Sequence, residues 1–328
     1  MIKIDASYLE GGGQIIRTAL ALSTITGKSF EAFNIRKGRP KPGLKAQHIH
    51  CIKALEKLCN AKSQFAELPS EKLIYEPKKI QGKTISINIG TAGSISLLLQ
   101  SLLIPCFFSD NKTRLRITGG TSGKWAMPFD FFKNIFAPQI KKYCKSIDAK
   151  LERRGYYPKG GGKVDIKIKP LEDKTSLPKF NSIDQGKLMQ IKGISHASKF
   201  LEKAEVAERQ AKAAKLLLNK FNIPVNIQKE YADTLSPGSG ITLWAVFSKD
   251  KDEIDINNPI LLGTDALGER GKRYNRIKKG EKVGYEFIIS NFYPLSMAKM
   301  VFRYKSEYMP TPIVSDLLAK SGIYEVKR

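Results

Sequence analysis

An internal repeat constrains the fold of this chain more than any other feature of its sequence. In the first copy the triplet Gly11-Gly12-Gly13 precedes an apolar run with helical spacing, a turn, a strand-like segment and a loop rich in cations. About 80 residues later the same steps recur in the same order after Gly90-Thr91-Ala92-Gly93. A period this long does not suit a solenoid, so we interpret the copies as duplicated units within one domain.

Each copy is predicted to contain a second helix and further strands. Apolar residues recur at helical spacing over 46–58 and again over 131–143. Strands are expected over 85–89 after the first pair of helices and over 163–168 after the second. The pattern predicts an α/β (α+β) fold in which two helices lie on a small sheet and the unit is repeated.

A change of composition over 170–184, where proline, lysine, aspartate and serine dominate, predicts a domain boundary. The segments that follow are a strand over 188–194, a long helix over 202–221, and strands over 225–229 and 241–247. This β-α-β-β order predicts a small inserted α/β domain over 184–267. Residues 1–183 and 268–328 are then expected to form the large domain.

Charge and hydropathy narrow the class of protein. The 328 residues carry a net charge of +25 and are 41% hydrophobic, which favours a folded protein with a polyanionic partner over a disordered basic tail. A lysine-rich surface that serves only solubility is the alternative.

No run of about 18 apolar residues occurs, and the start of the chain does not resemble a signal peptide, so we expect a cytoplasmic protein without a membrane span. The four cysteines form no Cys-x-x-Cys pair and are expected to be buried free thiols.

The first glycine triplet is a candidate phosphate site. Backbone amides at the glycines and at the start of the following helix can face an anion, and Arg17 lies in the first turns of that helix. A tight turn with an incidental cation is the alternative.

A second triplet, Gly160-Gly161-Gly162, lies in a loop over 153–163 that also contains arginines, lysines and adjacent tyrosines, among them Arg154 and Tyr157. The glycines allow a close backbone approach, and the side chains combine positive charge with a surface for stacking. We expect this loop and the first triplet to form a shared cradle for the end of a phosphate-bearing strand.

A basic loop over 36–45 contains five cations, including Arg39 and Lys41, between prolines and glycines. Such a loop suits a sugar-phosphate backbone, although a merely solvated loop has the same composition. Neither a Walker loop nor a dinucleotide-binding fingerprint is present, so any nucleotide is held by another design. The three histidines show no triad or metal spacing, and we expect His50 and His196 to be structural.

The chain resembles the RNA 3'-terminal phosphate cyclase family. The motifs are Glu-Gly-Gly-Gly-Gln-x-x-Arg at 10–17, Arg-x-x-Pro-Gly-Leu-x-x-Gln-His at 39–48, Gly-Thr-Ala-Gly-Ser at 90–94 with Gln100 following, Gly-Gly-Thr at 119–121 with Pro128-x-Asp130, Gly-Tyr-Tyr-Pro-x-Gly-Gly-Gly at 155–162, and Gly-x-x-His-Ala at 193–197 with Glu208-Arg209. They run in family order over about residues 1–273. The resemblance implies a large domain of three repeated units, each with a four-stranded sheet and two helices, and a small inserted α/β domain.

The resemblance also implies an ATP-dependent ligase that is adenylylated on a histidine, transfers AMP to an RNA 3'-phosphate, and closes a 2',3'-cyclic phosphate. A divalent metal, Mg or Mn, is expected to assist. By position, the residues implied to bind RNA phosphate and nucleotide are Glu10, Gln14, Arg17, Arg39, Lys41, Gln100, Asp130, Arg154 and Tyr157.

The C-terminal segment departs from the family pattern. Where the family has its nucleophilic histidine, this chain reads Pro310-Thr311, and no histidine follows His196. The aspartate that the family carries further upstream is also replaced, within residues 287–292. Two hypotheses therefore stay open: an active cyclase, and a catalytically silent RNA-binding member that acts in RNA processing or ribosome biogenesis. A metabolic enzyme for small phosphorylated substrates is a weaker third hypothesis, since it does not explain the charge.

Overall fold

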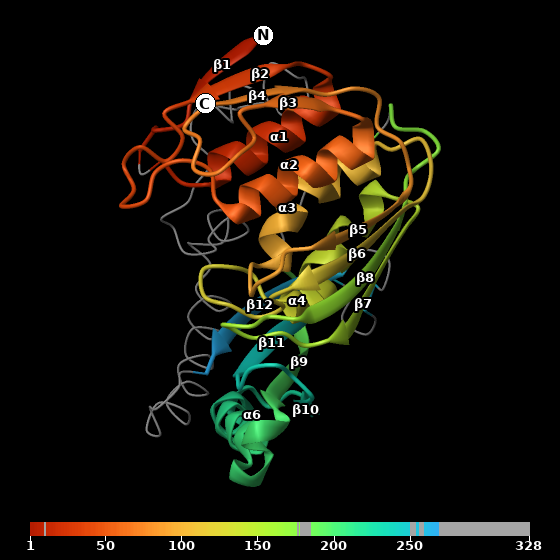
Figure 1. Ribbon diagram of the computed structural model, residues 1–328. Helices are drawn as coiled ribbons and strands as arrows, with labels where there is room; N and C mark the ends of the chain where they lie inside the picture. The colour runs from red at the N-terminus through yellow and green to blue at the C-terminus, as the bar shows by residue number, and fades with distance from the viewer. Residues whose placement is uncertain (10, 176, 178–184, 250–253, 256–258, 269–328) are drawn as a thin grey trace. The chain divides into compact units, whose positions relative to one another are not determined.

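The computed structural model describes residues 1–9, 11–175, 177, 185–249, 254–255 and 259–268 of the chain. These residues form two compact units, whose elements are labelled in Figure 1. The first unit contains residues 1–85 and 97–113, and the described part of the second contains residues 86–96 and 114–268.

The first unit is built on a four-stranded sheet with the strand order β1-β2-β4-β3. β1 and β2 are parallel, whereas β2 and β3 each run antiparallel to β4. Helices α1 and α2 lie side by side against one face of this sheet (Figure 1). The elements are β1 (Ile2–Asp5), α1 (Gln14–Thr26), β2 (Phe30–Phe33), α2 (Ala46–Cys59), β3 (Lys62–Gln64) and β4 (Leu73–Glu76).

The two helices form where the apolar spacing predicts them. Their buried faces carry Leu20 and Leu55, whose side chains are fully buried in the core. Each helix ends at a residue in the left-handed conformation, Gly27 with φ 68° and Asn60 with φ 51°. Glycine and asparagine are the residues that adopt this conformation most readily, so the sequence itself defines where the helices end.

The second repeat has a sheet with the corresponding strand order, β5-β6-β8-β7. In each repeat the last strand lies between the second strand and the third. This shared order confirms the predicted fold class, a mixed α/β fold of repeated four-stranded units. The elements are β5 (Thr84–Asn88), α3 (Ile95–Phe107), β6 (Thr113–Gly119), α4 (Phe129–Phe131), η1 (Phe132–Phe136), α5 (Ala137–Ile140), η2 (Lys141–Tyr143), β7 (Ser146–Arg153) and β8 (Gly162–Lys169).

The helix predicted over 131–143 is irregular. It begins in α conformation, widens to a π-helical segment at η1, and returns to α conformation at α5. Pro138 lies in the first turn of α5. Because proline has no amide hydrogen and its ring collides with the carbonyl four residues earlier, a regular α-helix cannot continue through this position.

The third sheet has the order β10-β9-β11-β12 and is covered on one face by α6. β9 pairs in parallel with β10 and antiparallel with β11, which also pairs with β12. The predicted β-α-β-β order is therefore present, with one further strand. The elements are β9 (Lys187–Ser198), η3 (Lys199–Ala204), α6 (Val206–Leu218), η4 (Asn219–Phe221), β10 (Val225–Ala232), β11 (Ser239–Ser248) and β12 (Ile260–Leu267).

The single helix predicted over 202–221 is divided. Glu205 adopts a left-handed conformation with φ 46° and separates the 3₁₀ segment η3 from α6. A left-handed glutamate cannot continue a right-handed helix, so the chain changes direction there. The prediction of one continuous helix was wrong at this residue.

Both faces of β11 are buried. One face, with Leu243 and Phe247, packs on α6, while the other, with Trp244 and Val246, packs on Ile135 of η1. A strand covered on both sides is uniformly apolar rather than alternating. The third sheet and the helical segment of the second repeat therefore share a hydrophobic core within the second unit.

All four cysteines, Cys51, Cys59, Cys106 and Cys144, are buried and free, which confirms the expectation for these residues. Within the part of the chain that the structure describes, no helix combines the length and apolarity needed to cross a membrane.

Candidate functional site: an uncapped helix start and a buried arginine

The first glycine triplet forms the bend that leads into α1. Gly11 has φ 58°, and its amide donates to the Tyr8 carbonyl at 3.0 Å. Gly13 occupies the N-cap position, and no side chain among the described residues caps the helix. Because the first amides of a helix have no partner within it, this bend provides backbone donors for an anion.

Arg17 lies one turn into α1 and is buried, with 8% of its surface exposed. Its Nε donates to Oε1 of Gln100, on α3, at 2.8 Å. Burial lowers the pKa of Arg17, and the nearby charge of Arg36 lowers it further. Within the described residues no carboxylate lies within ion-pair distance of Arg17. A buried cation that no described carboxylate pairs is a favourable place for an anionic ligand.

His48, in the first turn of α2, faces the same bend. A Cβ atom on Gly13 would lie 2.3 Å from Nε2 of His48 and 3.1 Å from Nη1 of Arg17, so only glycine fits there. The Lys45 amide donates to Nδ1 of His48 at 3.0 Å. Burial lowers the pKa of His48 to about 3, with contributions from Arg17, Arg36 and Lys45. The imidazole is therefore neutral near pH 7, and its proton lies on Nε2, the nitrogen that faces Gly13.

The basic loop lies against this bend. A Cβ atom on Gly11 would be 3.5 Å from the Cα atom of Arg36. Nη2 of Arg36 is 3.5 Å from the carbonyl of Lys41, and the Arg39 amide donates to the Arg36 carbonyl at 3.0 Å. Lys41 is exposed and Arg39 half-buried. The loop adds positive charge to the entrance of the helix.

The first unit thus brings together several of the residues predicted for the site. Arg17 and Gln100 are hydrogen bonded across 83 positions of sequence, and Gln14 lies on α1 one turn before Arg17. Arg39 and Lys41 lie on the adjoining loop. Glu10 lies outside the described residues, as do the C-terminal positions at 287–292 and 310–311.

His48 and Arg36 are not among the binding residues that were predicted from the sequence. The available signal was that His48 closes the motif at 39–48 and that Arg36 is the first cation of the basic loop. Only the fold shows that His48 and Arg36 both lie next to the first glycine triplet.

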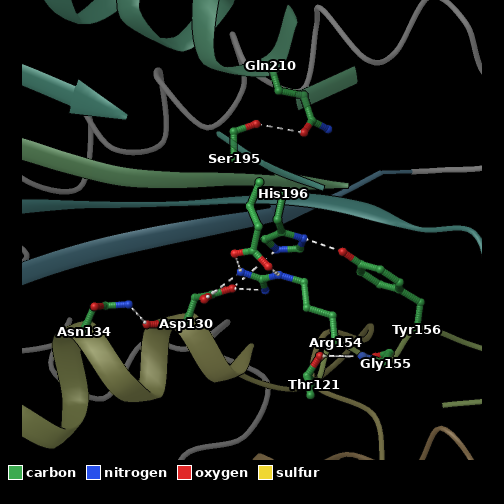
Figure 2. Close-up of polar contacts among 10 residues, drawn as sticks. Thr121, Asp130, Asn134, Arg154, Gly155, Tyr156, Ser195, His196 and Gln210 are labelled. Carbon is green, nitrogen blue, oxygen red and sulfur yellow. Dashed lines mark hydrogen bonds and ion pairs between the residues drawn. The ribbon is translucent and has the colours of Figure 1, made fainter. Parts of the chain in front are cut away.

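Arg154 and Asp130 occupy a different environment in the second unit, shown in Figure 2. Arg154 has 2% of its surface exposed and donates to both oxygens of Asp130, at 2.6 and 3.1 Å, and to both oxygens of Glu230, at 2.8 Å each. Burial lowers the pKa of Arg154, but the hydrogen bonds and charges of the two carboxylates raise it by more. Here two protein carboxylates already neutralise the guanidinium group.

His196 and Tyr156 extend the same network (Figure 2). Nε2 of His196 is 3.5 Å from Oδ2 of Asp130, and the hydroxyl of Tyr156 is 2.7 Å from Nδ1 of His196. Burial, followed by the charge of Arg154, lowers the pKa of His196 well below its usual range. A neutral imidazole with its proton on Nε2 accepts from the Tyr156 hydroxyl and points its N–H at Asp130.

The network connects the second repeat with the third sheet. Asp130 belongs to α4 and Arg154 directly follows β7, whereas His196 and Glu230 belong to β9 and β10. These side chains hold the two parts of the second unit together, which gives His196 the structural environment that the sequence analysis expected.

The second glycine triplet packs against other glycine-rich turns. A Cβ atom on Gly160 would lie 2.5 Å from the Thr91 carbonyl, and one on Gly120 would lie 2.3 Å from the Ala92 carbonyl. These backbones approach more closely than any side chain would allow. Next to the buried Tyr156, Tyr157 is 79% exposed on the surface of this turn. The two glycine triplets lie in different units, so a shared cradle stays a prediction.

Comparison with known proteins found one matching family model and several similar proteins. The family model described as RNA 3'-terminal phosphate cyclase matches residues 8–305 of the chain. A protein of Pyrococcus abyssi named RNA 3'-terminal phosphate cyclase is 45% identical over 274 residues, which cover 83% of this chain and 75% of the relative. A protein of Ignicoccus hospitalis with the same name is 38% identical over 96% of this chain and 85% of its own length, and one of Thermococcus gammatolerans is 40% identical over 99% and 88%.

Proposed function

The chain belongs to the RNA 3'-terminal phosphate cyclase family, and we propose from this premise that it converts an RNA 3'-phosphate to a 2',3'-cyclic phosphate at the expense of ATP. The observation that carries the proposal is the match of the family model to residues 8–305, with relatives of that name at 38–45% identity. The geometry of the first unit agrees with this chemistry, because it offers several donors to an anion at one bend.

The proposed reaction has two steps: transfer of AMP to the RNA 3'-phosphate, and closure of the cyclic phosphate with release of AMP. An oxygen of the RNA 3'-phosphate replaces pyrophosphate on the α-phosphorus of ATP, by way of an adenylylated enzyme in the family, and a phosphoanhydride forms between the RNA and AMP. The neighbouring 2'-oxygen then attacks the phosphorus of the 3'-phosphate, AMP leaves, and the hydroxyl proton is released. Activation by AMP is required because a phosphate monoester is a poor electrophile.

We assign the binding of phosphate oxygens to the start of α1. Arg17 supplies a charge that no described carboxylate neutralises, and Gln100 orients its guanidinium group. The neutral imidazole of His48 can donate from Nε2 to the same oxygens. Arg39 and Lys41 increase the positive potential at the entrance. Backbone and side-chain donors held rigidly in this way stabilise charge that develops on phosphate.

The proposal gives ATP as the nucleotide, because the family uses it. A divalent metal, Mg or Mn, is part of the original expectation. Within the described residues no group of three or more His, Cys, Asp or Glu side chains could hold a metal ion.

The proposed reaction also requires a residue that accepts AMP. The chain has three histidines, and the family position for the nucleophile reads Pro310-Thr311. That position lies beyond residue 305, where the match to the family model ends. The absence of a histidine there is the observation that favours the second candidate, a member that binds RNA 3' ends without turnover.

One experiment separates the two candidates. The chain is incubated with ATP, Mg²⁺ and a 5'-labelled oligoribonucleotide ending in a 3'-phosphate, and the product is treated with phosphatase. Phosphatase removes a 3'-phosphate and so changes the mobility of the labelled RNA. A cyclase makes the terminal phosphate resistant to this removal, so the mobility stays the same. RNA that ends in a 3'-hydroxyl is the control and shows no change. Parallel incubation with α-labelled ATP reports whether AMP becomes covalently attached to the protein.

Binding without protection in this assay would support the silent member and contradict the cyclase. If the protein shows no RNA binding and no protection of the 3'-phosphate, both candidates are contradicted. We also propose that the protein acts in the cytoplasm in RNA processing, and that residues 184–267 form a small domain inserted in a large one.

A further inference from the structure

A cavity of about 390 Å³ lies in the second unit, apart from the buried network around Arg154. It opens where the end of β7, the segment η3 and the loop after β10 meet. Six residues line it: Arg153, Lys199, Phe200, Asp233, Thr234 and Leu235. Its volume falls within the range of about 300–1,000 Å³ that is typical of sites for small ligands.

The walls of the cavity are fixed by hydrogen bonds. Nε of Arg153 donates to the Gly161 carbonyl at 2.7 Å, and the Lys159 amide donates to the Ser236 hydroxyl at 3.2 Å. The Thr234 hydroxyl is 2.9 Å from both the Ser198 hydroxyl and the Ser236 carbonyl. These contacts hold the loop after β10 against the second glycine triplet. The cavity is therefore a formed site rather than a gap between loose segments.

Exposed apolar side chains form one part of the lining. Phe200 is 70% exposed and Leu235 is 49% exposed. A Cβ atom on Gly161 would lie 2.5 Å from Cδ1 of Leu235, so the glycine bend supports this side chain from behind. A phenyl ring that is largely exposed beside a rigid apolar wall offers a surface for a flat ring.

Cationic groups form the other part. The Nε hydrogen bond of Arg153 uses one of the five N–H donors of its guanidinium group, and the remaining fork can contact a phosphate. Lys199 pairs with Asp233 at 2.8 Å, so the one carboxylate among the described lining residues is already compensated. A cation next to an aromatic ring in a protein of net charge +25 suits a polyanion that carries bases.

We propose that this cavity binds one nucleotide of the RNA strand upstream of the reactive 3' end, with its base on Phe200 and a phosphate on Arg153. The inference rests on the proposed function, because it takes its ligand from the RNA substrate. Stacking tolerates any base, so the site adds affinity for the strand without selecting its sequence. An acidic peptide would use the cations but would leave the phenyl ring without a flat partner.

Phe200→Ala and Arg153→Gln test the proposal. Leu216→Ala and Lys212→Gln serve as matched controls, since both side chains are exposed on α6 outside the cavity. Dissociation constants are measured by fluorescence anisotropy for a labelled single-stranded 12-mer and a labelled trinucleotide, each with a 3'-phosphate. Thermal melting verifies that each variant is folded.

Phe200→Ala should weaken binding of the 12-mer about 10-fold. Arg153→Gln should weaken binding of the 12-mer and reduce the slope of log K against log salt by about 0.7, the value for one phosphate contact in a single strand. The controls should bind like wild type. A series of intermediate lengths then identifies the nucleotide that first reaches the cavity.

The outcomes distinguish this inference from the function. If wild type cyclises RNA and both cavity variants bind the 12-mer normally, the inference is overturned and the function stands. If wild type binds RNA without cyclising it and the variants bind more weakly, the cavity is supported and the cyclase is not. If wild type binds neither RNA, the inference is overturned.

Discussion

Two buried arginines of this protein, Arg17 and Arg154, lie near similar sequence features and have different environments. Each is near a glycine triplet, and each has a buried histidine close by, His48 in one case and His196 in the other. Arg154 is bound by two carboxylates, whereas Arg17 is bound by one neutral amide among the described residues. Burial lowers the pKa of Arg17, while the carboxylates raise the pKa of Arg154.

The difference indicates how charge balance could separate a binding group from a structural one, and the variants below test this interpretation. A compensated guanidinium group is committed to the fold, because a ligand would have to displace strong protein partners. An uncompensated one keeps its affinity for an anion. Proximity to glycines and cations in the sequence does not distinguish these cases.

The starts of α1 and α3, which occupy corresponding places in the two repeats, show the same contrast. At α3 the Ile95 amide donates to the Gly120 carbonyl at 3.0 Å, and the Gly120 amide donates to the Gly93 carbonyl at 2.8 Å. The start of α3 is thus partly closed by the protein backbone. At α1 the Ile15 amide donates to the Gly12 carbonyl of the same bend at 3.3 Å, and no described side chain caps the helix. The start of α3 is thus contacted by a distant segment, whereas the backbone contact at the start of α1 is local.

The largest expected effect follows from removing the compensated arginine. Arg154→Met leaves the buried carboxylate of Asp130 without its partner, which should lower the free energy of unfolding by about 3–5 kcal/mol. Urea unfolding at pH 7 measures the change. Arg154→Lys keeps the charge but loses the bidentate geometry and should lie between wild type and Arg154→Met. A loss below about 1 kcal/mol for Arg154→Met would contradict a structural role.

The uncompensated arginine should show the opposite profile. Arg17→Gln removes a buried charge that no carboxylate of the described residues pairs, so the free energy of unfolding should stay the same or rise. Loss of the charge that faces phosphate should lower kcat/KM for cyclisation about 100-fold, which corresponds to about 2.7 kcal/mol. Steady-state kinetics and urea unfolding of the same variant measure both.

Lys57→Gln is the matched control, because this lysine is exposed in the last turn of α2. It should change neither quantity. If Arg17→Gln unfolds as readily as Arg154→Met does, the two arginines have the same role and the comparison fails.

The smallest expected effect concerns His48 and pH. Its pKa is about 3 in the folded protein and about 6.5 in the unfolded chain, so below pH 6.5 the unfolded state binds a proton that the folded state does not. His48 therefore removes stability as the pH falls from 6.5 toward 3, by about 2 kcal/mol between pH 7 and pH 5.

His48→Gln eliminates this contribution. Unfolding free energies of wild type and variant are compared at pH 7 and pH 5, and the drop should be about 2 kcal/mol smaller in the variant. The contribution of His196, which has the same sign, is present in both proteins and cancels. Equal drops would show that folding does not lower the pKa of His48, which would contradict its burial beside Arg17.

The sequence predicted the fold best where local signals agree. The bounds of α2 were predicted to within a residue, because the apolar spacing over 46–58 ends just before Asn60. The short strands β3 and β4 carry no such pattern and were not predicted. Nothing in the residues around Glu205 announces its left-handed conformation, since glutamate adopts it only where tertiary contacts impose it.

The candidate site was predictable in part. The family resemblance implied Gln14, Arg17 and Gln100, and the structure places all three in the first unit, with Arg17 bonded to Gln100. The carboxylates around Arg154 were not predictable from spacing, because Glu230 follows 76 residues later on β10. Compensation of a charge depends on the fold, so the sequence alone does not show which arginines are paired with carboxylates.

The adjacent side chains of Tyr156 and Tyr157 face opposite environments, and this alternation has a consequence for recognition. Tyr156 is anchored in the interior by His196, so the backbone that carries the exposed ring of Tyr157 is already ordered before any ligand arrives. The entropic penalty of arranging this turn is incurred during folding rather than during association. Contacts made by Tyr157 should consequently form quickly and with little rearrangement, as expected for a preorganised surface.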